Sequence, residues 1–361
     1  MKILFVVTGL SMGGAENQVV NLADELHTRG HHVTIAYIVE PATVLPRSAD
    51  VDIISLGGDK SLAGVLRVYK NLVKLIDSIN PDVVHSHMYH ANIISRLARV
   101  LVKIPKLICT SHSNNEGSSL RMLLYRVTNS LGDLFTGVSK RAVLEYEVKQ
   151  AVPKGKMVVM YNGIDADRFK FSQKSREHIR EELGLGEKKV FISVGRFHKA
   201  KDYPNLLRAY SMLLEEFNDV HLLIVGDGEL REEIKRLAKE LGIESFVTLL
   251  GVRRDIEDLL SASDLFVLSS AWEGFGLVVA EAMSCQRVVV ATDCGGVLEV
   301  VGECGYLVEP ENSYKLFESM RQAYLLDEKE FETKGKLARD RVLERYDLKG
   351  RVDKWEEIYG K

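Results

Sequence analysis

The sequence predicts an α/β protein made of two doubly wound parallel-sheet domains that face each other across a cleft. The chain has 361 residues, which exceeds the usual length of one domain. Short runs rich in Val, Ile and Leu alternate with amphipathic helical patterns, as expected for parallel strands buried on both faces. The alternation starts afresh near Val190. We therefore expect domains over residues 1–165 and 166–345, and a helix over 346–361 that returns to the first domain.

The expected strands are short, non-alternating apolar runs. Those of the first domain are Ile3–Val7, Val33–Ile38, Val83–His85, Leu107–Thr110, Leu134–Val138 and Val158–Met160. Those of the second domain are Val190–Val194, Val220–Val225, Val247–Leu249, Leu265–Leu268 and Val288–Ala291. Ligands of such sheets bind beyond the carboxyl ends of the strands, so the residues that follow these runs are the first candidates for a functional site.

Amphipathic helical patterns fill the intervals between the expected strands. They cover Ala15–Arg29, Leu62–Ile79, Asn92–Val102, Asn205–Glu216, Glu229–Leu241 and Leu277–Ser284. After Asn312 we expect helices over Tyr314–Leu325, Lys329–Arg345 and Leu348–Tyr359. The chain should pass between the domains at Tyr161–Asp165, where Asn-Gly is a turn dipeptide.

The composition indicates a globular protein with no general affinity for nucleic acid. Hydrophobic residues make up 46% of the chain and charged residues 27%, and the net charge is −3. Residues 1–165 hold 18 Lys/Arg and 14 Asp/Glu, so the first domain is mildly basic. The four cysteines form no CxxC pair, and we expect neither a disulfide framework nor a zinc site. No run resembles a signal peptide or a membrane span, so we expect a cytoplasmic protein.

Two loops that follow expected strands suit an anion. Gly13 and Gly14 follow the first strand at the start of a helix, where backbone N–H groups and the helix N-terminus favour negative charge. Arg196 and Lys201 share the loop after Val190–Val194, and two fixed cations suit a diphosphate. A glycine-rich turn without a ligand and a solvated basic loop remain open as alternatives.

The most specific segment is 270–282, which follows the expected strand Leu265–Leu268. Glu273 lies in a glycine-flanked loop, and Glu281 lies inside the helix that begins near Gly276. The N-terminus of this helix can hold phosphate, and a carboxylate one turn in can accept two hydrogen bonds from a ribose diol. Glu281 stands in an otherwise apolar stretch, where a buried carboxylate requires polar partners.

Taken in order, these segments resemble the family 4 retaining glycosyltransferases, whose GT-B fold has two Rossmann-like domains facing across a cleft. The resemblance covers nearly the whole chain and is to bacterial enzymes that build lipopolysaccharide, capsule or other polysaccharides and glycolipids. Each motif is weak alone, but the ordered set is specific. The matching segments are Gly13–Glu16, His85–His87, Thr110–His112, Val138–Lys140, Asn162–Asp165, Arg196 with Lys201, Gly226–Gly228, and Glu273 with Glu281.

The resemblance implies roles for the matching positions. Arg196 and Lys201 would clamp the diphosphate, and Glu281 would hold the ribose. Glu273 would contact the donor sugar, and His112 would lie beside the transferred sugar, so these two join the cations as candidate catalytic residues. The nucleotide-sugar site as a whole would comprise Gly13, Gly14, Arg196, Lys201, Val252, Arg253, Glu273, Gly274, Phe275, Gly276, Leu277 and Glu281.

The activity implied is retaining transfer of a hexose or N-acetylhexosamine from a nucleoside-diphosphate sugar, by family preference a UDP-sugar, to a hydroxyl of a glycan or lipid-linked acceptor. No metal and no other cofactor is expected, because Arg196 and Lys201 can do the work of a divalent ion. Asp50–Asp52 and Asp165–Asp167 imitate a DxD metal motif, but we interpret both as structural. Two alternatives stay open, a non-hydrolysing sugar-nucleotide epimerase and a non-catalytic sugar-nucleotide-binding protein.

The first domain could also meet an anionic membrane surface, which would place the protein at the inner face of the membrane. In segment 92–103, apolar side chains at helical spacing are expected to pack on the sheet and basic ones to face outward. The apolar set is Ile93, Ile94, Leu97 and Leu101, and the basic set is Arg96, Arg99 and Lys103. Segment 120–127 adds Arg121 and Arg126. A solvated helix face explains the same pattern. An acceptor loop would fall at 114–119.

Overall fold

The computed structural model describes residues 1–113 and 118–360, so most of the expected acceptor loop lies outside the described residues. The chain forms two compact units. The first comprises Met1–Gly163 and the segment that begins at Leu348, and the second is Ile164–Asp347. The chain passes between the units twice, and the two passages lie side by side, since Ile164 N–H donates to Tyr346 O at 2.7 Å.

The first unit is built on a sheet of seven strands, all parallel, in the order β3-β2-β1-β4-β5-β6-β7. Its strands are β1 (Lys2–Gly9), β2 (His32–Val39), β3 (Asp52–Gly58), β4 (Val83–His87), β5 (Lys106–Ser111), β6 (Leu134–Gly137) and β7 (Met157–Val159). The central strand β1 pairs with β2 on one side and β4 on the other, so the strand order reverses direction between β1 and β4.

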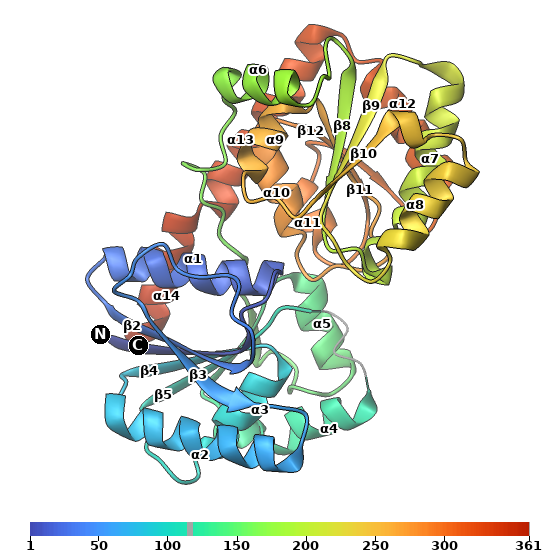
Figure 1. Cartoon of the computed structure of the whole chain (residues 1–361). Coiled ribbons are helices and arrows are strands. Elements are labelled where there is room, and N and C mark those ends of the chain that lie inside the picture. The colour runs from blue at the N-terminus through green and yellow to red at the C-terminus, as the bar shows by residue number, and fades with distance from the viewer. Residues whose placement is uncertain (114–117, 361) are drawn as a thin grey trace. The chain divides into compact units, whose positions relative to one another are not determined.

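Helices cover both faces of this sheet, as Figure 1 shows. On one face lie α1 (Gly14–Thr28) and α14 (Leu348–Gly360), which share a core with the sheet. On the other face lie α2 (Leu62–Ile79), α3 (Tyr89–Ala98), α4 (Ser119–Val127) and α5 (Lys140–Val148). A short 3₁₀ helix, η1, spans Asn129–Leu131.

The second unit repeats this plan with six parallel strands in the order β10-β9-β8-β11-β12-β13. Its strands are β8 (Lys189–Val194), β9 (Val220–Val225), β10 (Val247–Gly251), β11 (Leu265–Leu268), β12 (Val288–Thr292) and β13 (Tyr306–Val308). Here the order reverses between β8 and β11. The prediction of two parallel sheets with flanking helices is confirmed.

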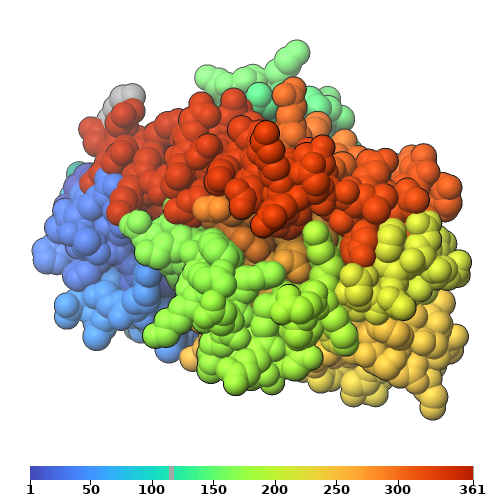
Figure 2. All heavy atoms as spheres, turned by 90° about the horizontal axis from the view of Figure 1, so that it is seen from above, coloured from blue at the N-terminus to red at the C-terminus, as the bar shows by residue number. Residues whose placement is uncertain are grey.

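The helices of the second unit also form two layers. One layer holds α7 (Tyr203–Glu216), α8 (Arg231–Glu240) and α12 (Ser313–Tyr324), which share a core with the sheet. The remaining helices are α6 (Gln173–Glu182), α9 (Ile256–Ala262), α10 (Leu277–Ser284), α11 (Val297–Val301) and α13 (Glu328–Tyr346), with 3₁₀ helices η2 (Lys199–Lys201) and η3 (Glu244–Phe246). Helix α13, red in Figure 2, lies at the surface. Over residues 1–113 and 118–360, no helix combines the length and apolar character needed to span a bilayer.

The expected strands did not include two that the structure contains, β3 and β13. Both lie at the outer edge of a sheet. An edge strand is covered less completely than a central one, and most residues of β3 and β13 are partly exposed. The apolar run of β3 is interrupted by Ser55 and followed by two glycines, and β13 has only three residues, so neither gives the longer continuous apolar run by which buried parallel strands are recognised.

The prediction for helix 92–102 was wrong in both its bounds and its outward face. Helix α3 spans Tyr89–Ala98, and Arg96 points into the core with only 1% of its surface exposed. The Arg96 guanidinium donates to Tyr125 O at 3.1 Å and Thr128 Oγ1 at 3.0 Å, and it lies 4.5 Å from the centre of the Phe135 ring. These partners compensate for its burial. Leu97 and Leu101, which were expected to be buried, are 41% and 66% exposed.

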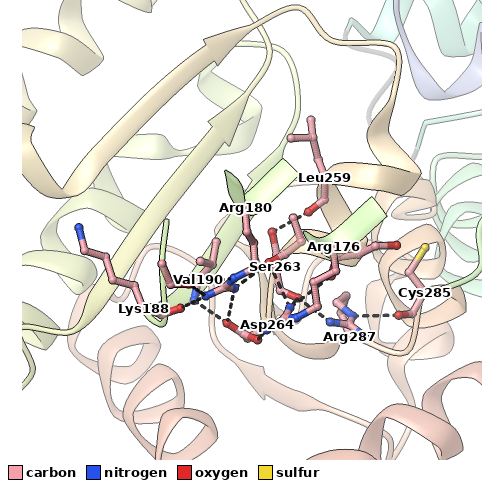
Figure 3. A network of polar contacts seen from close by, with 12 residues as sticks. Arg176, Arg180, Lys188, Val190, Leu259, Ser263, Asp264, Cys285 and Arg287 are labelled. Carbon is pink, nitrogen blue, oxygen red and sulfur yellow. Dashed lines mark hydrogen bonds and ion pairs between the residues drawn. The ribbon is translucent and has the colours of Figure 1, made fainter. Parts of the chain in front are cut away.

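A buried ionic network joins the amino ends of β8 and β11 (Figure 3). Asp264 accepts hydrogen bonds from Arg176 Nη2 and from the backbone N–H of Val190, both at 2.7 Å. Arg176 and Arg180 also donate to carbonyls at the end of α9, such as Ala262 O at 3.1 and 2.9 Å. These guanidiniums satisfy carbonyl groups that the helix leaves without an intrahelical partner.

Removing the carboxylate of this network should destabilise the second unit. We expect Asp264→Ala to lower the free energy of unfolding by about 3 kcal/mol, because it leaves two largely buried guanidinium groups, those of Arg176 and Arg180, without their counter-ion. The matched control is Glu216→Ala, which removes an exposed ion pair with Arg321 and should leave stability unchanged within error. Chemical denaturation of both variants checks this, and equal midpoints for the two would contradict it.

Candidate active site

The loops that follow β8 and β11 form one structure because these two strands are neighbours in the sheet. The backbone N–H of Ala271 donates to Ala200 O at 2.9 Å. The hydroxyl of Ser269 donates to Lys201 O at 2.7 Å. The loop that carries Arg196 and Lys201 is therefore fixed to the loop that carries Glu273. Both lie at the point where the strand order reverses, which is where open α/β sheets bind ligands.

A third loop, after β9, supports the loop of Arg196. A Cβ atom at Gly226 would lie 2.0 Å from Gly195 O, and Gly226 has φ +139°, so a side chain is excluded there on both counts. The N–H of Phe197 donates to Asp227 O at 2.9 Å. The Gly226–Gly228 motif thus allows two backbones to approach closely and positions the residues that follow β8.

The two candidate cations differ in their surroundings. The Lys201 ammonium forms an ion pair with Glu273 Oε1, and the Ser270 hydroxyl donates to the same oxygen at 2.9 Å. Arg196 is exposed, and its guanidinium makes no hydrogen bond or ion pair with any residue that the structure describes. Lys201 is therefore held in place, whereas Arg196 is available to a ligand.

Glu281 is the fifth of the eight residues of α10 and has an unusual environment. The helix begins after Gly276, whose φ of +89° is a conformation that favours glycine. The Glu281 carboxyl is largely buried and accepts no hydrogen bond from the described residues. Burial raises its pKa to about 7, while the charge of Arg168 acts in the opposite direction. A carboxylate without a hydrogen-bond partner among the described residues, one turn into a helix, suits a ligand that carries hydroxyl donors.

Arg168 is a residue of this region that the sequence analysis missed. Its Nε and Nη2 atoms donate to the two carboxyl oxygens of Glu257 at 3.0 and 2.9 Å. Its backbone N–H donates to Asp165 Oδ1 at 3.1 Å, so Asp165 stabilises the turn after the chain enters the second unit. No sequence spacing links Arg168 to Glu281, since the electrostatic interaction between them depends on the fold. The only signal was its position three residues after the Asn162–Asp165 motif.

Some of the predicted donor-site residues form ion pairs or packing contacts within the protein. The Arg253 guanidinium pairs with Asp255 at 2.5 Å and Glu182 at 3.0 Å, whereas Val252 beside it is 52% exposed. The Phe275 ring packs edge-on against Tyr346 with 5.4 Å between centroids. Leu277 is likewise buried, so it and Phe275 fix the segment that also contains Gly274 and Gly276.

The glycine-rich loop of the first unit begins α1, as predicted. Gly13 is the N-cap residue and Gly14 the first helical residue. A Cβ atom on Gly13 would lie 2.4 Å from Glu16 Oε2, so a carboxylate folds back over the first turn. Negative charge is favoured there. The loop follows β1, one of the two strands between which the order reverses in this sheet.

His112 follows β5, is half-buried, and continues a chain that begins with the buried histidines His85 and His87. His112 Nε2 lies 2.9 Å from His87 Nδ1, and the His87 ring lies 4.1 Å from the His85 ring. His85 in turn lies 2.7 Å from both Tyr359 Oη and Thr110 Oγ1. Burial lowers the pKa of His112 to about 4, so its ring is neutral near pH 7.

The partners of His87 favour one tautomer of His112. His87 Nε2 is buried without a hydrogen-bond partner among the described residues. An unpaired acceptor costs less than an unpaired N–H donor, so the proton of His87 belongs on Nδ1. His87 then donates to His112 Nε2, which places the proton of His112 on its Nδ1 atom.

A pocket of about 290 Å³ lies elsewhere, at the amino ends of β8 and β11. It is lined by Arg176, Arg180 and Asp264 among others, which form the network of Figure 3. Their donors are bonded to carbonyl and carboxylate oxygens of the protein. The pocket therefore lies at the opposite edge of the sheet from Arg196, Lys201 and Glu273.

Two family models match the chain. The model described as Glycosyltransferase Family 4 covers residues 12–168, and the model described as Glycosyl transferases group 1 covers residues 175–339. The two matches together include all of the candidate residues in both units.

Similar proteins and structures point the same way. The chain is 31% identical to N-acetyl-alpha-D-glucosaminyl L-malate synthase of Bacillus anthracis over 81% of this chain and 78% of the relative. It is 28% identical to UDP-Gal:alpha-D-GlcNAc-diphosphoundecaprenol alpha-1,3-galactosyltransferase of Escherichia coli over 80% and 78%. The crystal structure of Anabaena HepE in complex with UDP and glucose matches with a TM-score of 0.86 and 23% identity, over 100% of this chain and 99% of HepE. The chain therefore belongs to glycosyltransferase family 4, with the GT-B fold.

Proposed function

We propose that the protein is a retaining glycosyltransferase that moves a hexose or N-acetylhexosamine from a UDP-sugar to a hydroxyl group of a lipid-linked or glycan acceptor. The observation that carries this proposal is the edge of the second sheet, where Arg196, Lys201, Glu273 and the N-terminus of α10 with Glu281 follow adjacent strands. We assign the donor to this edge and the acceptor to the first unit.

The charges at this edge suit a diphosphate leaving group. Arg196 can donate two parallel hydrogen bonds to phosphate oxygens, and Lys201 adds a fixed positive charge. Both would stabilise the negative charge that develops as the bond to the sugar breaks, which is often the largest contribution to catalysis. Glu281 would accept the ribose hydroxyls, and Glu273 would contact the sugar.

Retention is proposed through front-face attack. The acceptor oxygen would bond to the anomeric carbon on the face from which the diphosphate leaves, and a departing phosphate oxygen would take the acceptor proton. A double displacement would need a carboxylate free to act as nucleophile. Glu273 is instead held by Lys201 and Ser270. His112, neutral at pH 7, would donate a hydrogen bond from Nδ1 to a sugar oxygen.

The choice of donor and acceptor is supported by similar proteins. The structures of HepE contain UDP and UDP-glucose, and the Escherichia coli relative is named for UDP-Gal and a diphosphoundecaprenol-linked acceptor. A lipid-linked acceptor resides in a membrane. We therefore propose that the protein works at the cytoplasmic membrane face.

The test is the release of UDP from a panel of UDP-sugars, with and without acceptor. We expect Arg196→Ala and Glu281→Ala each to lower kcat/KM by about tenfold or more, because each removes a contact to the donor. The control Arg236→Ala removes an exposed arginine of α8 and should have no effect. Wild-type activity in both site variants would refute the assignment. Epimerisation of the UDP-sugar would identify an epimerase. Binding of the UDP-sugar without turnover would identify a non-catalytic binding protein.

Donor affinity should depend on the ionisation of Glu281. Its pKa is raised to about 7, so it is mostly protonated at about pH 6 and mostly ionised at about pH 8. Only the ionised carboxylate accepts hydrogen bonds from two hydroxyls at both oxygens. We therefore expect the Kd of a UDP-sugar, which itself does not titrate in this range, to fall by about tenfold between these pH values. Calorimetry measures it. Glu281→Gln should abolish the dependence, and an unchanged slope in that variant would contradict the assignment.

Activity should not require a divalent metal. Arg196 and Lys201 are proposed to supply the positive charge that a metal ion supplies in metal-dependent transferases. Turnover should therefore persist after dialysis against EDTA. Complete loss of activity that Mn²⁺ or Mg²⁺ restores would contradict the prediction and direct attention to Asp50–Asp52 and Asp165–Asp167.

A further inference from the structure

His87 is a buried histidine that ends β4 and has a single polar partner in the part of the chain that the structure describes. Residues two apart on a strand point to the same face, so His85 and His87 both point to the face that α1 and α14 cover. The His87 ring lies 4.1 Å from that of His85 and 5.4 Å from that of Phe5. Its one hydrogen bond is to His112, over 2.9 Å from Nδ1 to Nε2.

A histidine is an unfavourable choice for this position unless its N–H has a use. His87 is only 1% exposed, and its Nε2 atom is buried without a hydrogen-bond partner among the described residues. A buried polar atom in this state destabilises the fold. A phenylalanine would pack among the same rings without that cost. An unsatisfied buried group calls for an explanation, and the bond from His87 to His112 supplies one.

Each of the three rings carries one proton near pH 7. Burial lowers the pKa of His85 and of His87 well below the usual value and lowers the pKa of His112 to about 4. A neutral imidazole donates from one nitrogen and accepts at the other. The bond from His87 therefore leaves the proton of His112 on Nδ1. His112 is half-buried, and its Nδ1 has no hydrogen-bond partner among the described residues, so this N–H is available to a ligand.

The C-terminal helix α14 holds the ring on which His87 packs. Tyr359 Oη lies 2.7 Å from His85 Nδ1, and Thr110 Oγ1 lies 2.7 Å from His85 Nε2. The tyrosine hydroxyl has no other hydrogen-bond partner among the described residues, so it donates to Nδ1 and His85 donates to Thr110. The Trp355 ring packs 4.5 Å from the same imidazole. His85 is thus fixed at both nitrogens and limits the orientations open to His87.

We propose that His87 is a positioning residue, whose Nδ1–H holds His112 in the tautomer that presents an N–H to the transferred sugar. In the opposite arrangement His112 would donate to His87. Its Nδ1 would then carry a lone pair, which suits a base, and the proton of His87 would lie on the buried nitrogen that has no partner. The inference rests on the proposed function for the identity of the ligand, but the tautomer itself does not depend on any activity.

Three variants separate the donated bond from the packing of the ring. His87→Phe keeps an aromatic ring and removes the donor. His87→Asn keeps a donor, because its amide nitrogen and the Nδ1 of histidine are both bonded to Cγ. The matched control is His221→Phe in β9. His221 is 8% exposed, bonds to Thr248 Oγ1 at 2.8 Å and also has a buried nitrogen without a partner among the described residues, but it lies in the second unit.

The first measurement is the nitrogen NMR spectrum of the full chain labelled at histidine, near pH 7. Protonated and unprotonated ring nitrogens have different chemical shifts, and His112→Gln identifies the signals of His112. We expect Nδ1 of His112 to be protonated in the wild type, in His87→Asn and in His221→Phe. In His87→Phe the proton should move in part to Nε2. A wild type protonated on Nε2, or an unchanged His112 signal in His87→Phe, would overturn the proposal.

The second measurement is turnover of a UDP-sugar by the same preparations, with thermal unfolding as the check on folding. We expect His87→Phe to lower kcat about tenfold, because His112 then offers its N–H to the sugar only part of the time. The Kd of UDP, which has no sugar, should not change. His87→Asn should recover most of the lost kcat, and His221→Phe should match the wild type.

Several results would count against the positioning role. They are a wild-type kcat in His87→Phe, an equal loss of kcat in His87→Phe and His221→Phe, and a kcat in His87→Asn as low as in His87→Phe. If His87→Phe does not fold, the wild-type spectrum and His87→Asn decide the question. Absence of turnover in the wild type would count against the proposed function alone, because the spectra report the tautomer without turnover.

Discussion

Parallel pairing of every strand is the constraint on which the candidate site depends. In a parallel sheet all carboxyl ends meet at one edge, and where the strand order reverses, two neighbouring loops turn to opposite faces and leave room for a ligand. In the second unit this reversal lies between β8 and β11, the strands that precede Arg196 and Glu273. In the first unit it lies between β1 and β4. The glycine-rich loop follows β1, and His87 ends β4.

The amino edge and the carboxyl edge of the second sheet therefore have different roles. At the amino edge, the charges are matched: Asp264 is neutralised by arginines that also bind helix carbonyls. At the carboxyl edge Lys201 and Glu273 form an ion pair, but Arg196 and Glu281 have no hydrogen-bond or ion-pair partner among the described residues. An unpartnered carboxyl group in a poorly solvated site is unfavourable for the folded state, as its raised pKa reflects. Such strain is typical of sites that are completed by a ligand.

Strand burial and parallel pairing also determine which parts of the fold and of the site could be predicted from the sequence. Central strands such as β9 and β11 were predicted with their bounds, because burial on both faces leaves a continuous apolar run. In the edge strand β3 this run is interrupted by Ser55 and followed by two glycines, and the edge strand β13 is only three residues long. Residues that follow strands could be assigned to one edge because parallel pairing brings them there. Arg168 could not, since its position near Glu281 depends on contacts between distant segments. The burial of Arg96 could not be predicted either, because its partners come from α4 and β6.

Helix α14 has a consequence for the order in which the protein forms during synthesis. Trp355 and Tyr359 complete the core of the first unit, where the Trp355 ring lies 4.5 Å from that of His85 and the Tyr359 hydroxyl bonds to its Nδ1. Domains generally fold in the order in which they leave the ribosome. Here the unit that emerges first must wait for a helix that emerges after the whole of the second unit. The second unit can thus be complete while the first still exposes the apolar sheet face that α14 will cover.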